Sequence, residues 1–236
     1  MSWALEAHIL LRLYGGYAIR YRCPDYRDWL DEMGRHHEDL DFVCVRKAVE
    51  PLRRQLDAFG YAEDAAVYIN SEGNRLIFSH RDHPLHIDVF VDVADFSHKN
   101  VLSDRLHLDY WTAPLSDLLI GKLQIVQADQ KDLVDAIALL LGHPLTAGDA
   151  DGISTGRIAG LCSKDWGLWR TLTGNLDKVT AYATGTSALP PGGHIRLASQ
   201  VAALREAIDA APKSRGWRMR AKIGERVKWY NDVDEV

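Results

Sequence analysis

Three aspartates stand within runs of strand-forming residues. Asp39 and Asp41 are separated by one residue at the start of the run 40–45, and Asp88 lies inside the run 85–91. Successive side chains of a strand point to opposite faces, so Asp39 and Asp41 share one face. A third carboxylate from a neighbouring strand would complete a set of hard oxygen ligands of the kind that Mg²⁺ or Mn²⁺ prefers. The three aspartates are therefore candidate metal ligands.

A pair of glycines, Gly15 and Gly16, precedes these aspartates in the chain. Without a Cβ, their backbone N–H groups can approach a phosphate closely. A glycine turn, two aspartates on one strand and a third on another are the outline of a nucleotidyl-transfer site. In that reaction a hydroxyl attacks the α-phosphorus of an NTP, and two metal ions neutralise the phosphate charge. Asp88 is the first candidate for a general base.

The spacing of apolar residues predicts the elements that would position these side chains. The expected elements are a helix over 3–13, a strand over 40–45, a helix over 46–59 with Pro51 in its first turn, and a hairpin of 74–79 with 85–91. Burial of Ile87 and Val89 on one face would direct Asp88 to the other. Residues 17–22 fit a strand or a second helix, and 24–38 are expected to be irregular.

The pattern becomes helical from about residue 115. Helices are expected over about 115–123, 131–141, 154–184, 193–211 and 214–230, with a turn-rich linker at 144–152. We therefore expect an α/β (α+β) domain with a short mixed sheet at 1–143 and a helical bundle at 152–236.

The order of these motifs resembles the nucleotidyltransferase superfamily of the DNA polymerase β type. The residues that carry the resemblance are Gly15-Gly16-x-Ala18, Arg35-x-His37-x-Asp39-x-Asp41 and Ile87-Asp88. The segment from Asp117 to Leu123, followed by Lys131-Asp132-x-x-Asp135, is similar to the bacterial AbiEii-type branch, which includes toxins of toxin–antitoxin pairs. The resemblance covers residues 5–142. The chain departs from it at His37, where a threonine is frequent, and in the long acidic stretch before Asp39.

The resemblance implies the nucleotidyltransferase fold and an Mg²⁺-dependent enzyme that transfers a nucleoside monophosphate from an NTP. It implies that Lys122 contacts the triphosphate and that Arg35 and His37 lie near the nucleotide. Asp135, with Asp132 as a weaker candidate, would order Lys122, assist the acceptor hydroxyl or only solvate its helix. The acceptor would be an RNA end, such as that of a tRNA, or a protein, and an antitoxin protein is a candidate partner.

Composition narrows the class of protein. The net charge is −5 and 47% of the residues are hydrophobic, as in an ordinary globular chain. No apolar run is long enough for a membrane span, and the amino terminus lacks the pattern of a secretory signal. The three cysteines have no metal-like spacing, so reduced, unpaired thiols in the cytoplasm are expected.

The last segment differs in charge from the whole chain. Between Lys213 and Lys228 there are seven Lys or Arg against one acid, with Trp217 and Trp229 interleaved. Basic residues with aromatics can hold phosphates and stack bases, which favours an RNA acceptor. The same pattern also fits the solvated face of a terminal helix.

Two other functions stay open on the sequence alone. The first is a transferase that modifies a small molecule. Its cationic, aminoglycoside-like acceptor would be attracted by the acidic residues that precede the aspartate motif, which are Asp25, Asp28, Asp31 and Glu32. The second open function is that of a protein that binds a nucleotide without catalysing a reaction. The spacing of His80, His83 and His86 invites a zinc site, although turn and strand histidines are more often structural or exposed.

Overall fold

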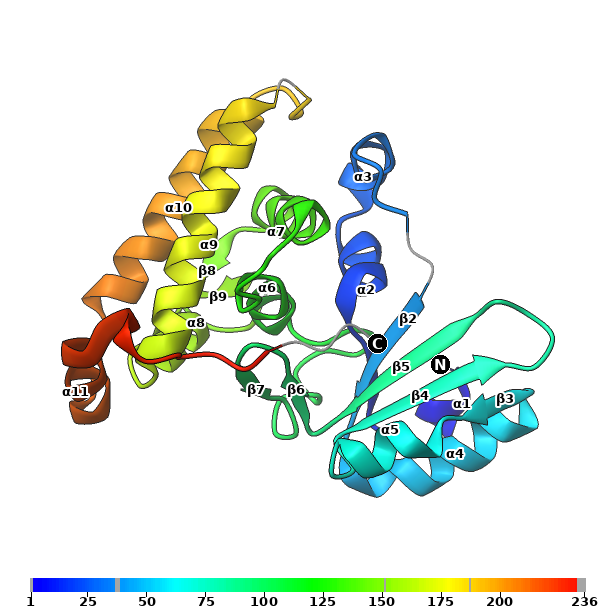
Figure 1. Cartoon of the computed structure of the whole chain (residues 1–236). Helices are drawn as coiled ribbons and strands as arrows, with labels where there is room; N and C mark the ends of the chain where they lie inside the picture. Colours follow the sequence, from blue (N-terminus) through cyan, green and yellow to red (C-terminus); the bar gives the residue numbers. More distant parts are fainter. Residues whose placement is uncertain (1, 37–38, 151, 187, 233–236) are drawn as a thin grey trace. The chain divides into compact units, whose positions relative to one another are not determined.

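A mixed five-stranded sheet carries the three aspartates in the computed structural model of the chain, which describes residues 2–36, 39–150, 152–186 and 188–232 (Figure 1). Its strands, in spatial order, are β1 (Leu11–Leu13), β2 (Asp39–Cys44), β5 (His86–Val91), β4 (Arg75–His80) and β3 (Tyr61–Glu63). β2 and β5 run parallel, and every other neighbouring pair is antiparallel. The expected short mixed sheet is confirmed, and so is the hairpin of β4 with β5.

One face of this sheet is apolar and buried. Cys44, Phe78 and Val89 lie in its core, packed against α4 (Val49–Ala58) through Leu52 and Leu56. These two leucines recur at helical spacing, so α4 presents one apolar stripe to the sheet. Because side chains alternate along β2 and β5, the aspartates occupy the opposite face.

The chain divides into two compact units. The sheet unit comprises residues up to Tyr21, His36–Ala94 and Lys99–Pro114; the helical unit comprises Arg22–Arg35, Asp95–His98 and the chain from Leu115 onward. The smaller elements of the sheet unit are α1 (Ser2–Glu6), α2 (Gly15–Arg22, to Tyr21), a short 3-10 turn (Arg46–Ala48) and α5 (Ala65–Asn70). A two-stranded ribbon pairs β6 (Val93–Asp95) with β7 (Lys99–Val101).

The helical unit is built around α6 and α7, whose apolar residues are almost fully buried. Its elements are a 3-10 turn (Pro24–Tyr26), α3 (Arg27–Glu32), α6 (Leu115–Leu123), α7 (Gln130–Gly142), β8 (Leu145–Thr146), β9 (Ile153–Ser154), α8 (Thr155–Cys162), α9 (Trp166–Gly185), α10 (Gly193–Ala210), α11 (Arg215–Ile223) and a last 3-10 turn (Gly224–Arg226). Side-chain caps from Asp129, Ser154, Asp165 and Ser214 begin four of these helices. The expected bundle is present, but it includes α6 and α7, so the division of the chain does not fall at 143–152.

Two predictions of secondary structure are wrong, and for a third segment the structure decides between two alternatives. The helix expected over 3–13 ends at Glu6, and Leu11–Leu13 forms β1, because pairing with β2 satisfies its backbone. The stretch 24–38, expected to be irregular, contains α3, which buries Trp29 and Leu30. Residues 17–22 continue the helix α2.

The structure also bears on the predictions about the cysteines and about membrane-spanning segments. The three cysteines, Cys23, Cys44 and Cys162, are free and buried, as expected. None of the helices that the structure describes is long and apolar enough to cross a membrane.

Candidate functional site

The three predicted metal ligands lie on one face of the sheet. Asp41 of β2 pairs directly with Asp88 of the parallel strand β5, and Asp39 pairs with His86 two residues earlier on each strand. Neighbouring strands lie about 4.8 Å apart, so this register sets the Asp41 and Asp88 backbones side by side. Asp39 is exposed and Asp41 is half-buried. The sheet therefore places on one face three carboxylates, of which that of Asp88 lies far from the other two in the sequence.

Arg75, which the sequence did not single out, holds Asp88. Its Nη2 donates to Asp88 Oδ2 at 2.6 Å, and its Nε donates to Oδ2 at 2.9 Å and to Oδ1 at 3.1 Å. Burial raises the pKa of Asp88 and Arg75 lowers it; burial prevails, so this pKa lies above its usual value. The signal that could have found Arg75 is the hairpin register, which pairs Arg75 with Phe90 on the aspartate face.

Replacing Arg75 with methionine is expected to leave Asp88 charged and unpaired near neutral pH. The expected loss is about 1–3 kcal/mol of unfolding free energy. The pKa of Asp88 is already raised, so its carboxylate form opposes folding, and protonation relieves the cost. The loss should therefore shrink as the pH falls from about 7 to about 4.5, measured by urea unfolding. Arg75→Lys is the control, and a loss that grew on acidification would contradict the assignment.

Gly15 brings the start of α2 against Asp41. A Cβ at Gly15 would lie 1.9 Å from Asp41 Oδ2, and Gly15 has φ +59°, where side chains are strained. The backbone N–H of Tyr14 donates to the carbonyl of Asp41 at 2.8 Å. The amino end of a helix leaves N–H groups without intrahelical partners, which favours anions there. The predicted phosphate-binding turn and the Asp41 carboxylate are thus in direct contact.

The donor set on this face fits a divalent cation in chemistry and in charge. Three carboxylates face one guanidinium, which leaves a net charge that Mg²⁺ or Mn²⁺ would neutralise. The set is not drawn together, however: within the described part of the chain, no three carboxylate, imidazole or thiol groups lie close enough to hold a metal ion. One of the three carboxylates, that of Asp88, is bonded to the guanidinium of Arg75 instead.

A second charged cluster lies in the helical unit and is formed by Arg35, Lys122, Asp132 and Asp135. Arg35 grips both oxygens of Asp135 at 2.9 Å. The Nζ of Lys122 lies 3.0 Å from Asp135 Oδ2 and 3.1 Å from Asp132 Oδ1. The Asp135 side chain has no exposed surface. Two cations and two carboxylates make this cluster neutral.

The cluster shifts the pKa values of its members. Burial raises the pKa of Asp135, but Lys122 and Arg35 outweigh it and hold this pKa below its usual value. Burial lowers the pKa of Lys122, but Asp135 and Asp132 outweigh it and hold this pKa above its usual value. Asp135 and Lys122 therefore stay charged near neutral pH. The arrangement matches the idea that the two aspartates order Lys122; its contact with a triphosphate stays a prediction.

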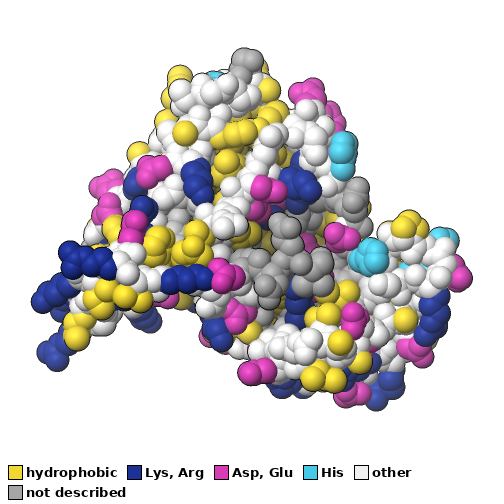
Figure 2. Space-filling model, in the orientation of Figure 1, with side chains coloured by type: hydrophobic (Ala, Val, Ile, Leu, Met, Phe, Trp, Pro, Cys, Tyr) yellow, Lys and Arg dark blue, Asp and Glu magenta, His cyan; other side chains and the backbone are white. Residues whose placement is uncertain are grey.

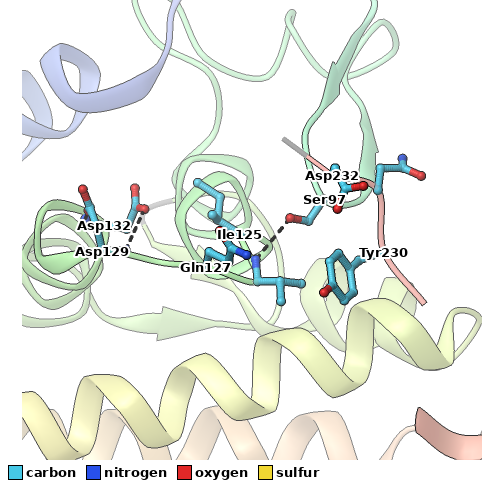
Figure 3. Close-up of a pocket in the computed structure, with 9 residues that line it drawn as sticks. Ser97, Ile125, Gln127, Asp129, Asp132, Tyr230 and Asp232 are labelled. Carbon is cyan, nitrogen blue, oxygen red and sulfur yellow. Dashed lines mark hydrogen bonds between the residues drawn. The ribbon is translucent and has the colours of Figure 1, made fainter. Parts of the chain in front are cut away.

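A pocket of about 310 Å³ in the helical unit adjoins this cluster through Asp132 (Figure 3). Asp132 and Asp129 cap α7 together, each accepting from the other's backbone N–H. Across the pocket, the backbone N–H of Val126 donates to Ser97 Oγ at 3.1 Å. Tyr230 and Asp232 line the remaining side. Two pairs of the residues drawn around this pocket are thus hydrogen-bonded to each other, Asp129 with Asp132 and Val126 with Ser97.

The histidines do not assemble a metal site in the described chain. The rings of His80 and His83 are 4.8 Å apart, but His80 Nδ1 accepts the backbone N–H of Asp82, and His80 packs edge-on against Tyr61. His86 bonds to Ser79 and is exposed on the aspartate face. His37 lies outside the described residues, so its expected nucleotide contact stays a prediction.

The chain matches no protein-family model, no curated protein and no solved structure. What the chain does must therefore be inferred from the geometry of the two charged clusters and from the residues that form them.

Proposed function

We propose that this chain has a nucleotidyltransferase fold and transfers a nucleoside monophosphate from an NTP to an acceptor hydroxyl, with pyrophosphate as the leaving group. The observation that carries the proposal is the contact of the α2 amino end, at Gly15, with the carboxylate of Asp41 beside Asp88. Nucleotidyl transfer needs N–H groups that bind phosphate and carboxylates that hold a metal ion. Here Gly15, at the start of α2, lies against the Asp41 carboxylate.

Each residue of the sheet unit has a distinct task in this proposal. Asp39 and Asp41 hold the metal, and Asp88 completes the set and takes the proton from the acceptor hydroxyl. The raised pKa of Asp88 makes its carboxylate a better base than an exposed one. The N–H groups of Gly15 and Gly16 bind phosphate oxygens. The divalent ion, when bound, polarises the phosphoryl group and neutralises its charge.

The helical unit contributes in a second way. Lys122, ordered by Asp132 and Asp135, contacts the triphosphate, and Arg35 fixes the position of Asp135. We propose an RNA end, such as that of a tRNA, or a protein as acceptor, action in the cytoplasm and an antitoxin protein as a candidate partner. Neutrality of the cluster supports a positioning role for Asp135 over a direct catalytic one.

The test is an incubation with each α-³²P-labelled NTP, Mg²⁺ and total bacterial RNA. We expect label on RNA or on protein with the wild type and none with Asp41→Asn or Asp39→Ala. The matched control is Asp57→Asn, which removes an exposed carboxylate paired with Arg81 and should leave labelling unchanged. Equal labelling by Asp41→Asn and the wild type would refute the proposed site.

A small-molecule acceptor is the second candidate, because four acidic residues near α3 are exposed: Asp25, Asp28, Asp31 and Glu32. A cationic aminoglycoside is therefore added as acceptor in a parallel reaction. Label on the aminoglycoside alone would favour this class of enzyme over the RNA or protein modifier. NTP binding without any label, in wild type and Asp39→Ala alike, would indicate a binding protein.

A further inference from the structure

The outward face of α11 is a row of cations with no partner in the described chain. Arg215, Arg218, Lys222 and Arg226 are exposed, and none of their side chains forms an ion pair or hydrogen bond with a described residue. Arg215, Arg218 and Lys222 recur at intervals of three and four residues, so they lie on one side of the helix, and Arg226 lies in the turn that follows it. In Figure 2, dark blue side chains gather at the end of the molecule where Figure 1 shows α11.

The opposite face of α11 is firmly anchored in the helical unit. Trp217 packs edge-on against Trp169 with ring centroids 5.2 Å apart. Arg220 donates to the carbonyls of Gly224 and Val227 and lies 4.8 Å above the Trp166 ring. These contacts hold the helix in one orientation, so the four unpaired cations are presented as a fixed row.

The tryptophans of this segment are used in packing. Trp217 joins Trp169, Trp169 joins Trp166, and Trp166 joins Trp229, all as ring pairs within 6.3 Å. Trp229 Nε1 also donates to Thr171 Oγ1 at 3.1 Å. The expectation that Trp217 and Trp229 stack on bases therefore finds no support in the structure. Any nucleic-acid contact at α11 must come from its cations.

We infer that the row of Arg215, Arg218, Lys222 and Arg226 binds the phosphate backbone of a nucleic-acid strand without reading its sequence. A helix rises 1.5 Å per residue, so the three cations of α11 extend over about 10 Å, with Arg226 in the turn beyond the helix end, and the row can follow successive phosphates. Three of the four are arginines, whose planar guanidinium groups bind phosphate oxygens in pairs. The net charge of the whole chain is −5, so this row is a local feature.

Exposed apolar side chains beside the row define the competing occupants. Met219 is 70% exposed and Ile223 is 45% exposed, next to the cations on the same helix. An acidic protein or an anionic lipid surface would bury both, whereas a phosphate backbone needs only the cations. Because four exposed cations outnumber these two apolar side chains, a nucleic-acid strand is the occupant that the charges favour.

The test measures binding of a fluorescein-labelled single-stranded RNA and of the same sequence as DNA, without NTP or Mg²⁺, by anisotropy over a series of salt concentrations. Four phosphate contacts on a single strand predict a log–log salt slope of about −2.8, which is about a 50-fold loss of affinity for a fourfold rise in salt. We expect Arg218→Gln/Lys222→Gln to reduce this slope by about 1.4. Binding of RNA alone, or of both strands, identifies the source of the phosphates.

The matched control is Lys47→Gln/Arg54→Gln, which removes two exposed cations without described partners from the sheet unit. It should leave the slope unchanged, as should Met219→Ser/Ile223→Ser. An unchanged slope in Arg218→Gln/Lys222→Gln would overturn the inference. An equal reduction in the control pair, or loss of binding on changing Met219 and Ile223, would also overturn it. The result is independent of nucleotidyl transfer, which this experiment does not require.

Discussion

Replacing Asp135 with asparagine is expected to lower the free energy of unfolding by about 3–5 kcal/mol. The Asp135 side chain has no exposed surface and bonds to both Lys122 and Arg35. The amide keeps the shape but removes the negative charge that both Lys122 and Arg35 face, and of the two cluster carboxylates only Asp132, which bonds to Lys122, would remain. Urea unfolding at neutral pH measures the loss.

The pH dependence of this variant has a definite sign. The pKa of Asp135 lies below its usual value, so its stabilising effect is complete above the unfolded pKa of about 3.9 and is lost as the pH falls further. The difference between wild type and Asp135→Asn should therefore narrow below about pH 4. The control is Asp177→Asn, at an exposed pair with Arg205, which should cost less than about 1 kcal/mol. A loss for Asp135→Asn no larger than that of this control would contradict the buried-cluster account.

Replacing Gly15 with alanine is expected to abolish nucleotidyl transfer as well as to destabilise the sheet unit. The backbone at φ +59° costs an alanine about 1–2 kcal/mol. In addition, the new Cβ would lie 1.9 Å from Asp41 Oδ2, so the carboxylate must move. Unfolding by urea measures the first effect, and labelling from an α-³²P-NTP measures the second.

Gly34→Ala separates the two effects. Gly34 has φ +70°, but a Cβ there would meet nothing within 4 Å. This variant should therefore carry the backbone cost alone and retain activity. If Gly15→Ala and Gly34→Ala lost equal stability and both stayed active, the contact between α2 and Asp41 would have no role in the site.

The elements that the sequence predicted well are those whose pattern is local. The helix α4 follows from the spacing of Leu52 and Leu56, and β5 from the alternation of Ile87, Asp88 and Val89. Where the structure depends on distant pairing, the pattern failed. Leu11–Leu13 is a strand only because β2 lies beside it, and the helix α3 depends on burial of Trp29 and Leu30 within an otherwise polar stretch.

The candidate site divides in the same way. Alternation along β2 predicted that Asp39 and Asp41 share a face, and burial of Ile87 and Val89 directed Asp88 away from the core. The parallel pairing of β2 with β5 then sets all three on one face. Arg75 was missed because its bond to Asp88 depends on hairpin register, which the hydrophobic pattern alone does not report. The helical spacing of Asp132 and Asp135 suggested that they order Lys122, but Arg35 as a second partner of Asp135 could not be read from sequence separation.

The interleaving of the two units has a consequence for how the protein can be divided. The chain passes between them after residues 21, 35, 94, 98 and 114, so neither unit is a continuous stretch of sequence. A fragment that ends at residue 143 would keep α6 and α7 but remove α8, α9 and α10, against which they pack. Truncation or domain exchange at a single position in the chain therefore cannot yield either unit with all of its segments.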